Sequence, residues 1–534
     1  MRTGLCRVLT TLFGLLSVAS CVRNLDESAA TDILIDKQGY NGNQDPQKAY
    51  GILLDAGSGS TKPTVWHWDP CYDRVPKLKL VEKQARLPPL ASFARTEGGK
   101  PEEAGRALEP ALLRAKAIIP EELWKHTPIF LTATAGMRLI PEKDRADILR
   151  VVNVWLADPS NHPFLYGTSP PFSDGEFWSQ TISGEDEGAY GFLDVNFLLG
   201  KLVGQDKSEY IVRCESNSTR DGIDCSDPAL SLGSKSMGAI GWIDTGGASL
   251  QVSFAPQESS ILGNVYPVSP IQFTHITNST GSRYASTMLY THSWNGLGQR
   301  EARKRMQRGI SRAADIGKKA ERFAGGTMFS DPCLLRGQRQ DMTFETEAGR
   351  PPRNVTFVGG SDFYMCQWFV DDFVLNLREE CLLSPCGAAG VYVPEPGSIT
   401  FMGFRKMLEL ARPLGLAKKH GSWAPSYEEL METVHRVCRM SGEEAHQAGI
   451  PDEWETDSGP CFKGVLIMRF LQTIGSPRIV FADRIHAHKF TYARGAMLSF
   501  IVEQDRRSHR SRPKGWPQCL SAVATSGSPA PEAE

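Results

Sequence analysis

Two short segments of the sequence combine an aspartate with glycines and hydroxyl residues, the chemistry that phosphate binding needs. The apolar run 50–54 leads into Asp55 and DAGSGST, and the run 239–243 leads into Asp244 and DTGGAS. Glycines let a backbone approach phosphate closely, and turned N–H groups bind its oxygens. Both aspartates suit a hydrated divalent cation, which prefers oxygen ligands. The residues available to phosphate are Gly57, Ser58, Gly59, Ser60, Thr61, Gly246, Gly247 and Ser249.

The two segments follow one pattern: a buried strand, then Asp-x-Gly, then small hydroxyl residues. A weak internal duplication of this kind is expected when two similar domains face one cleft. Two facing loops would clamp a polyphosphate. The alternative is that each is an ordinary glycine-rich turn. Because the pattern recurs at like positions after like strands, we favour phosphate binding.

Three carboxylates in a row begin a predicted helix. Glu185, Asp186 and Glu187 lie in the segment SGEDEG, and the apolar spacing over 188–202 is helical. One of them would serve as a general base that aligns a water for attack on phosphorus. The alternative is a charged helix N-terminus, where the helix dipole favours acids.

Several other nucleotide and metal sites are excluded. The sequence has no GxxxxGK[ST] segment and no HExxH segment, so it is neither a P-loop enzyme nor a zinc protease of that type. Lys62 stands where the dinucleotide-binding fingerprint needs a third glycine.

Strands that alternate with helices over most of the chain predict an α/β protein. A further strand is expected at 129–136, and helices at 299–323, 365–377 and 427–440. The 534 residues exceed one core and imply at least two domains. The net charge of -2 offers no basic field for nucleic acid. The basic run at 506–514 is interpreted as part of a disordered tail, 504–534.

Residues 1–20 have the features of a signal peptide. Arg2 and Arg7 precede a mostly apolar run, 8–18, and small residues stand before Cys21. The run is short for a membrane span. An uncleaved anchor and a lipoprotein box with Cys21 lipidated stay open as alternatives. No later segment reaches the roughly 18 apolar residues of a spanning helix, so the mature protein is expected to be soluble or luminal.

The cysteines and sequons favour a secretory pathway. Of 12 cysteines, Cys6 and Cys21 fall in or beside the signal, and the other ten are even in number, which suits an oxidising compartment. Glycosylation sequons begin at Asn217, Asn278 and Asn354.

Four blocks then occur together: DAGSGSTK, ATAGMR (133–138), SGEDEGAYGFLDVNFLLG (183–200) and DTGGASLQ (244–251). In order and spacing they resemble the conserved regions of the nucleoside triphosphate diphosphohydrolase (apyrase) family of the actin-like ATPase superfamily. Weaker matches extend the resemblance over about residues 50–500. They lie at 290–293, 331–333, 386–392 and 494–498.

The resemblance implies an actin-like fold of two ribonuclease-H-like lobes, with the active site in the cleft between them. Lobe I would comprise 48–183 with a C-terminal return at 483–503, and lobe II would comprise 184–482. Residues 21–47 would be a linker. It also implies three disulfides, Cys381–Cys386, Cys438–Cys461 and Cys333–Cys366, while proximity alone suggests Cys214–Cys225.

The implied activity is hydrolysis of nucleoside tri- and diphosphates with Ca²⁺ or Mg²⁺. By motif match, Glu187 is the base that activates water, with Ser249 as its partner. Asp55, Asp244, Thr134 and Gln251 would hold the cation through water. Residues 57–61 and the group Gly246, Gly247 and Ala248 would bind the phosphates.

The sequence departs from the family at positions on the side of the site that would face the nucleotide base. Ser60 replaces the histidine of animal ecto-enzymes, Lys62 resembles the basic residue of plant and Golgi-type members, and Tyr492 replaces a tryptophan. The stretch 401–407 lacks the usual tyrosines, which leaves Phe404, Arg405 and Tyr492 as base-binding candidates and predicts loose base selectivity. The alternatives are a luminal nucleoside diphosphatase, a polyphosphatase-like hydrolase, and a catalytically weak nucleotide-binding protein.

Overall fold

The computed structural model describes residues 48–72, 75–167, 178–202, 219–220, 223–224, 227–232, 238–256, 265–268, 287–316, 321–323, 326–344, 353–451, 459–485, 488–506 and 517. The predicted signal peptide, the linker, the sequons at Asn217 and Asn278, the pair Cys214–Cys225 and most of the predicted tail lie outside these residues.

The first sheet has the strand order β3-β2-β1-β4-β5. Strands β1 and β2 form an antiparallel hairpin, and β4 and β5 add to β1 in parallel. Every residue of β1 is buried, as its continuous apolar run predicts. The strands are β1 (Ala49–Ala56), β2 (Thr61–Trp68), β3 (Lys79–Lys83), β4 (Ile129–Ala133) and β5 (Ser179–Thr181).

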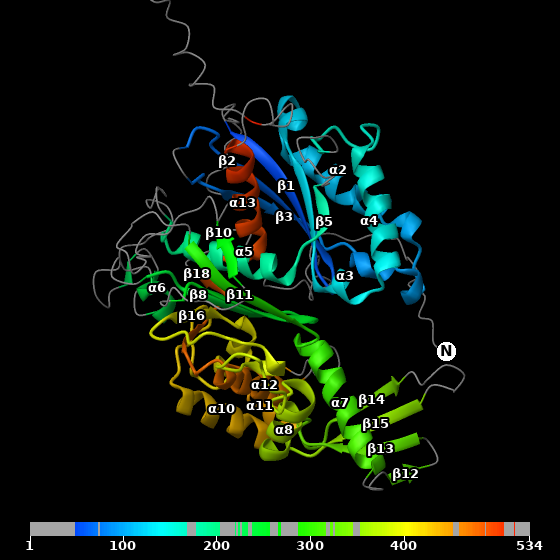
Figure 1. Cartoon of the computed structure of the whole chain (residues 1–534), viewed down its shortest axis with the longest axis vertical. Helices are drawn as coiled ribbons and strands as arrows, with labels where there is room; N and C mark the ends of the chain where they lie inside the picture. Colours follow the sequence, from blue (N-terminus) through cyan, green and yellow to red (C-terminus); the bar gives the residue numbers. More distant parts are fainter. Residues whose placement is uncertain are drawn as a thin grey trace, which may run out of the picture. The chain divides into compact units, whose positions relative to one another are not determined.

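The second sheet repeats this arrangement in the order β10-β11-β9-β8-β16-β17. Strands β8 and β9 form the hairpin, and β16 and β17 add in parallel. The strands are β8 (Gly241–Thr245), β9 (Ser249–Phe254), β10 (Val265–Val268), β11 (Thr287–Asn295), β16 (Thr400–Gly403) and β17 (Arg478–Phe481). The predicted α/β class and internal duplication are confirmed (Figure 1).

Two helices connect the sheets. Helix α5 (Gly184–Leu198) follows β5 of the first sheet but packs on β8, β9 and β11 of the second. Helix α13 (Tyr492–Arg506) follows the second sheet and contacts both α5 and β1 (Figure 1). The predicted lobe boundaries assume such an exchange of helices, and they stay a prediction. Helix α13 extends to Arg506, slightly beyond the predicted start of the tail.

The start of α5 is fixed by local chemistry. The Asp186 backbone N–H donates to the Ser183 hydroxyl (2.9 Å), and the Ser183 N–H donates to the Asp186 carboxylate (3.0 Å). This reciprocal capping box ends the preceding loop and satisfies two N–H groups. Of the three predicted candidates, Asp186 is therefore a capping residue, and Glu185 and Glu187 remain.

Other helices and strands surround the two sheets. The helix expected at 299–323 ends at Ile316, and residues 321–323 form a strand. The helix expected at 365–377 is observed as α8 (Phe363–Phe369) followed by a π-helical turn at Val370–Val374. The remaining helices are α2 (Glu109–Ile118), α3 (Ala135–Leu139), α4 (Glu142–Ala157), α6 (Pro228–Ser231), α7 (Gln299–Ile316), α8 (Phe363–Phe369), α9 (Leu408–Ala411), α10 (Tyr427–Arg439), α11 (Gly442–Gln447) and α12 (Pro460–Thr473). The remaining strands are β6 (Thr219–Arg220), β7 (Ile223–Asp224), β12 (Glu321–Phe323), β13 (Gly326–Asp331), β14 (Arg339–Phe344), β15 (Arg353–Gly359), β18 (Arg484–Ile485) and β19 (His488–Lys489).

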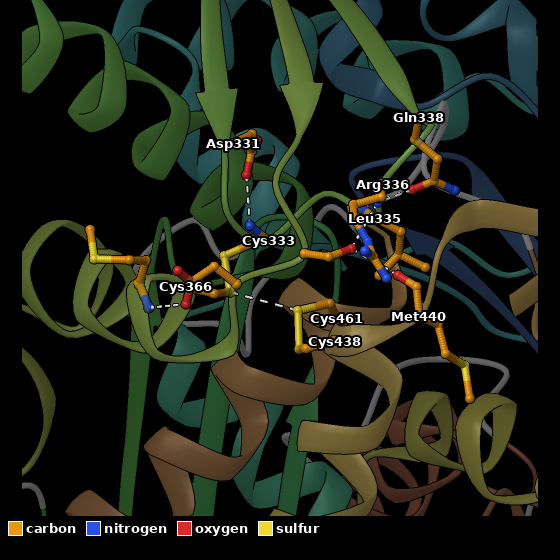
Figure 2. The surroundings of a disulfide bond; sticks show 12 residues. Asp331, Cys333, Leu335, Arg336, Gln338, Cys366, Cys438, Met440 and Cys461 are labelled. Carbon is orange, nitrogen blue, oxygen red and sulfur yellow. Dashed lines mark hydrogen bonds between the residues drawn. A yellow bond between two sulfur atoms is a disulfide. The ribbon is translucent and has the colours of Figure 1, made fainter. Parts of the chain in front are cut away.

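Three predicted disulfides are confirmed: Cys333–Cys366, Cys381–Cys386 and Cys438–Cys461. Figure 2 shows that the first and third lie side by side, with the sulfurs of Cys366 and Cys461 3.9 Å apart. The first joins the segment after β13 to α8, and the third joins α10 to α12. None of the helices that the structure describes has both the length and the apolar character that crossing a membrane requires.

Candidate active site

The two aspartate loops are matched hairpin turns. The Gly57 N–H donates to the Ser60 carbonyl, and the Gly246 N–H donates to the Ser249 carbonyl, each at 3.0 Å. In the strand register Asp55 lies opposite Lys62, and Asp244 lies opposite Gln251. The two aspartates therefore occupy the same position in the two copies of the motif.

The tips of the two loops approach each other. A β-carbon at Gly247 would lie 3.2 Å from the Ser58 hydroxyl oxygen, and one at Gly136 would lie 2.7 Å from the Ser58 α-carbon. The glycines therefore allow the first loop to lie against both the second loop and α3. Gly59 and Gly246 are exposed, and Ser58 is partly exposed. This arrangement fits the prediction that the loops face one another.

Thr61 is a correction within the first loop. Its side chain is completely buried, and its hydroxyl donates to the Pro88 carbonyl at 2.9 Å. It fixes the start of β2 and has no free donor for phosphate. Ser60 and Ala248 are also buried, so only their backbone groups stay candidates for phosphate binding.

Glu187, Ser249, Gln251 and Arg138 form one hydrogen-bonded cluster. The Glu187 carboxylate accepts from Arg138 Nη2 at 2.9 Å and from Gln251 Nε2 at 3.0 Å. The Ser249 hydroxyl accepts from the same two groups, at 3.4 and 2.5 Å. The predicted base and its predicted partner are thus brought together by shared donors. The Gln251 amide nitrogen donates to both side chains and so orients them.

The surroundings of Glu187 tune its proton affinity. Burial raises its pKa to about 7, the Arg138 guanidinium opposes that rise, and the negative charges of Asp55 and Asp244 add to it. A carboxyl group whose pKa lies near the working pH is suited to general-base catalysis. Because the charges of Asp55 and Asp244 both act on this pKa, both aspartates lie within electrostatic range of Glu187.

Asp55 and Asp244 fit a cation held through water. Tyr492 donates its hydroxyl to one Asp55 oxygen (2.7 Å), and Lys62 pairs with the other (3.1 Å). Burial raises the pKa of Asp244, against the charges of Arg405 and Lys62. A nearby cation would stabilise the negative charges of two carboxylates that are shielded from water. Among the residues that the structure describes, no group of three or more His, Cys, Asp or Glu side chains is arranged to hold a metal ion.

Thr134 lies close to this position. It follows β4 directly, is buried, and donates its backbone N–H to the Ala56 carbonyl at 3.1 Å. Since β4 runs parallel to β1, the carboxyl ends of the two strands place Thr134 beside the residues that follow Asp55.

One of the predicted nucleobase-binding residues, Phe404, needs correction. Phe404 is 1% exposed and lies within the apolar core, as does Phe401, so neither ring offers a face to a base. The Tyr492 hydroxyl donates to Asp55, but the residue is partly exposed and stays a candidate for contact with the nucleotide base. Arg405 is exposed and stays a candidate.

Sequence reasoning missed Arg138 and Lys62 as site residues. Arg138 is the charged residue that ends ATAGMR, and it reaches Glu187, Ser249 and the Ile182 carbonyl. Lys62 could have been found from the hairpin itself, because a two-residue side-chain period places it beside Asp55 once the register is known.

The chain is similar to known nucleoside phosphatases over most of its length. A model of the GDA1/CD39 (nucleoside phosphatase) family matches residues 41–509. Ectonucleoside triphosphate diphosphohydrolase 1 of Mus musculus is 27% identical over 440 residues, which cover 79% of this chain and 74% of that protein. The Golgi apyrase of Schizosaccharomyces pombe is 28% identical over 362 residues, 65% of this chain; the match spans about half of that longer protein, 52%.

A solved structure shares the fold. The nucleoside triphosphate hydrolase structure from Neospora caninum superposes with a TM-score of 0.57 at 17% identity, and the match covers 90% of this chain and 96% of that one. The arrangement of two similar sheets is therefore common to both proteins.

Proposed function

This chain belongs to the GDA1/CD39 family of nucleoside phosphatases and is an enzyme of that class, and we propose that it releases the terminal phosphate of nucleoside tri- and diphosphates with Glu187 as the base. The observation that carries this proposal is the cluster in which Glu187 and Ser249 share the donors Arg138 and Gln251. The cluster stands beside two facing loops of the phosphate-binding type.

The proposed chemistry follows from where these groups converge. A water between the Glu187 carboxylate and the Ser249 hydroxyl attacks the terminal phosphorus, and Glu187 takes its proton. The bond from phosphorus to the bridging oxygen breaks, and the shortened nucleotide leaves with that oxygen. Backbone N–H groups of the two loops bind the phosphate oxygens. A divalent cation near Asp55 and Asp244 would supply positive charge to the phosphate chain.

Glu187→Gln tests the assignment. Loss of a general base costs about 10²–10⁴-fold in rate, and glutamine keeps the size of the side chain. Glu185→Gln is the matched control, because Glu185 lies in the same first turn of α5. Its rate of phosphate release should stay within a few-fold of the wild-type rate. Phosphate release is measured with and without Ca²⁺ or Mg²⁺. A Glu187→Gln enzyme that turns over at the wild-type rate would refute the assignment.

The proposal includes a secretory location and a choice between substrate ranges. The three disulfides suit an oxidising compartment, and a Golgi apyrase is among the relatives.

Because no described aromatic residue among 401–407 presents a free ring, we propose weak selection between nucleotide bases. A panel of kcat/KM values for four bases at one phosphate chain length tests this, and a preference above about a hundredfold (about 2.7 kcal/mol) would contradict it and favour a narrower nucleoside diphosphatase.

A further inference from the structure

Gly247 lies at the tip of the second loop, and two side chains border the space that its missing side chain leaves. A β-carbon at Gly247 would lie 3.2 Å from the Ser58 hydroxyl oxygen and 3.4 Å from the guanidinium carbon of Arg300. Arg300 comes from α7, a basic helix to which sequence analysis gave no function. It therefore reaches the place where the first and second loops meet.

The position of Arg300 is fixed by backbone contacts. The N–H groups of Gln299, Arg300 and Glu301 donate to the carbonyls of Gly246 and Gly247, at 2.9, 3.0 and 3.1 Å. A β-carbon at Gly298 would collide with the backbone nitrogens of Ala248 and Ser249. These contacts use the first N–H groups of α7 to hold the loop, so any anion contact here depends on the Arg300 side chain and not on the helix end.

The guanidinium of Arg300 is available to a ligand. Its Nε lies 3.5 Å from the Glu301 carboxylate, and the side chain is 38% exposed. Within the described ranges its two terminal nitrogens make no hydrogen bond. Arg138 of the site and Arg303 of the same helix are, by contrast, paired with Glu187 and Asp331. Arg300 thus has two donors with the planar geometry that matches phosphate oxygens.

We propose that Arg300 binds the phosphate chain of the substrate where it passes between the two loops, and so determines affinity for polyphosphates independently of the base. The inference rests on the proposed function, because it takes the loops to be the phosphate site. The ligand class is the phosphate chain shared by nucleoside tri- and diphosphates and inorganic tripolyphosphate. A contact made to the bound chain before and during reaction changes KM more than kcat.

Arg300→Gln tests the proposal, with Arg308→Gln as the matched control. Arg308 is an exposed arginine on the same helix, about two turns away, and has no place in the site. A charged hydrogen bond of the usual strength predicts a rise in KM of about 10–100-fold in Arg300→Gln, with kcat within about threefold. The rise should be equal for adenine, guanine, uracil and hypoxanthine nucleotides, and Arg300→Lys should restore part of the affinity because it retains the charge. Arg308→Gln should leave KM unchanged.

Three results would overturn the inference: an unchanged KM in Arg300→Gln, a change confined to one base, or an equal change in Arg308→Gln. The second would mean that Arg300 contacts the base, and the third would mean a general effect of charge on α7. Calorimetric binding of a non-hydrolysable triphosphate analogue to the same variants needs no turnover. If the wild-type protein releases no phosphate, the proposed function fails, while the difference in analogue affinity between Arg300→Gln and Arg308→Gln still decides the role of Arg300.

Discussion

Glu187 is a residue whose protonation depends on charges of both signs. Burial and the two aspartates raise its pKa, and Arg138 lowers it. As the base must be a carboxylate to accept a proton, activity should fall as the pH drops below the pKa, which is about 7 without a bound cation. The group that most directly keeps Glu187 ionised is therefore Arg138, at 2.9 Å.

Replacement of Arg138 should move the pH profile in a defined direction. Arg138→Met removes the positive charge that favours the carboxylate, so the pKa of Glu187 rises and the acid limb of kcat/KM shifts to higher pH. Arg138→Lys keeps a charge and should shift the limb less. The profile is measured from about pH 5 to 9 at fixed cation concentration. An acid limb at the wild-type position in Arg138→Met would contradict the electrostatic role.

Asp55 and Asp244 should act together on one cation. Asn at either position removes a negative charge but keeps the size, so the Ca²⁺ or Mg²⁺ concentration for half-maximal activity should rise in both variants. Asp158→Asn, at an exposed carboxylate after α4, is the control. The measurement is a cation titration of phosphate release, together with circular dichroism to verify the fold. Identical titration curves in both variants and the wild type would refute a shared cation.

Among single residues, sequence patterns point to the candidate reactive groups more directly than to the groups that support them. Asp55, Asp244 and Glu187 were recognisable because their motifs are local and specific. The side chains of Thr61 and Phe404 were assigned to substrate, but tertiary contacts with Pro88 and with the apolar core already use them. A hydroxyl or a ring looks the same in a sequence whether or not tertiary contacts already use it.

Among the elements, the helix pair α5 and α13 joins the two sheets. Arg494 of α13 and Asp194 of α5 form a buried ion pair at 2.5 Å between side chains that are 4% and 1% exposed. The Thr491 N–H donates to the other Asp194 oxygen at 2.7 Å. A β-carbon at Gly495 would collide with the Tyr190 carbonyl, so the helices cross with backbones in contact. Glu187 lies on α5, and the orientation of this helix therefore depends on α13.

Breaking this ion pair should cost more than replacing it. Asp194→Ala leaves the buried Arg494 charge without its counter-charge, and we expect a loss of about 3–5 kcal/mol in the free energy of unfolding. The double variant Asp194→Leu with Arg494→Met removes both charges and should lose clearly less. Chemical denaturation of the two variants is the measurement. If the double variant is as unstable as Asp194→Ala, the pair itself, and not the stranded charge, supplies the stability.

Periodicity and capping signals predicted elements, but not where tertiary pairing interrupts them. The capping residues Ser183 and Ser426 mark the starts of α5 and α10, which lie close to their expected ranges. The helix expected to run to 323 stops at Ile316 because Glu321–Phe323 pairs with β13 as an antiparallel strand. Polar, basic sequence continues through both, so composition alone could not separate them.

Over the whole molecule, disulfides close loops of very different length. Cys333–Cys366 spans 33 residues and Cys381–Cys386 spans 5. In the chain-entropy model the longer loop contributes about 4 kcal/mol and the shorter about 2 kcal/mol. Replacing both cysteines of a pair by serine should therefore lower the melting temperature more for the first pair than for the second. Calorimetry of the two double variants decides; an equal or opposite ranking would show that local packing outweighs loop closure.

The hydrogen bond from Tyr492 to Asp55 joins residues 437 positions apart. A ribosome that adds about 5–20 residues per second needs about 20–90 s to pass from one to the other. During that interval the first hairpin has already been made, but the tyrosine that holds its aspartate does not yet exist, and neither does the helix that packs beside α5. Each molecule therefore passes through a period of its synthesis in which most of the enzyme is present and its active site is still incomplete.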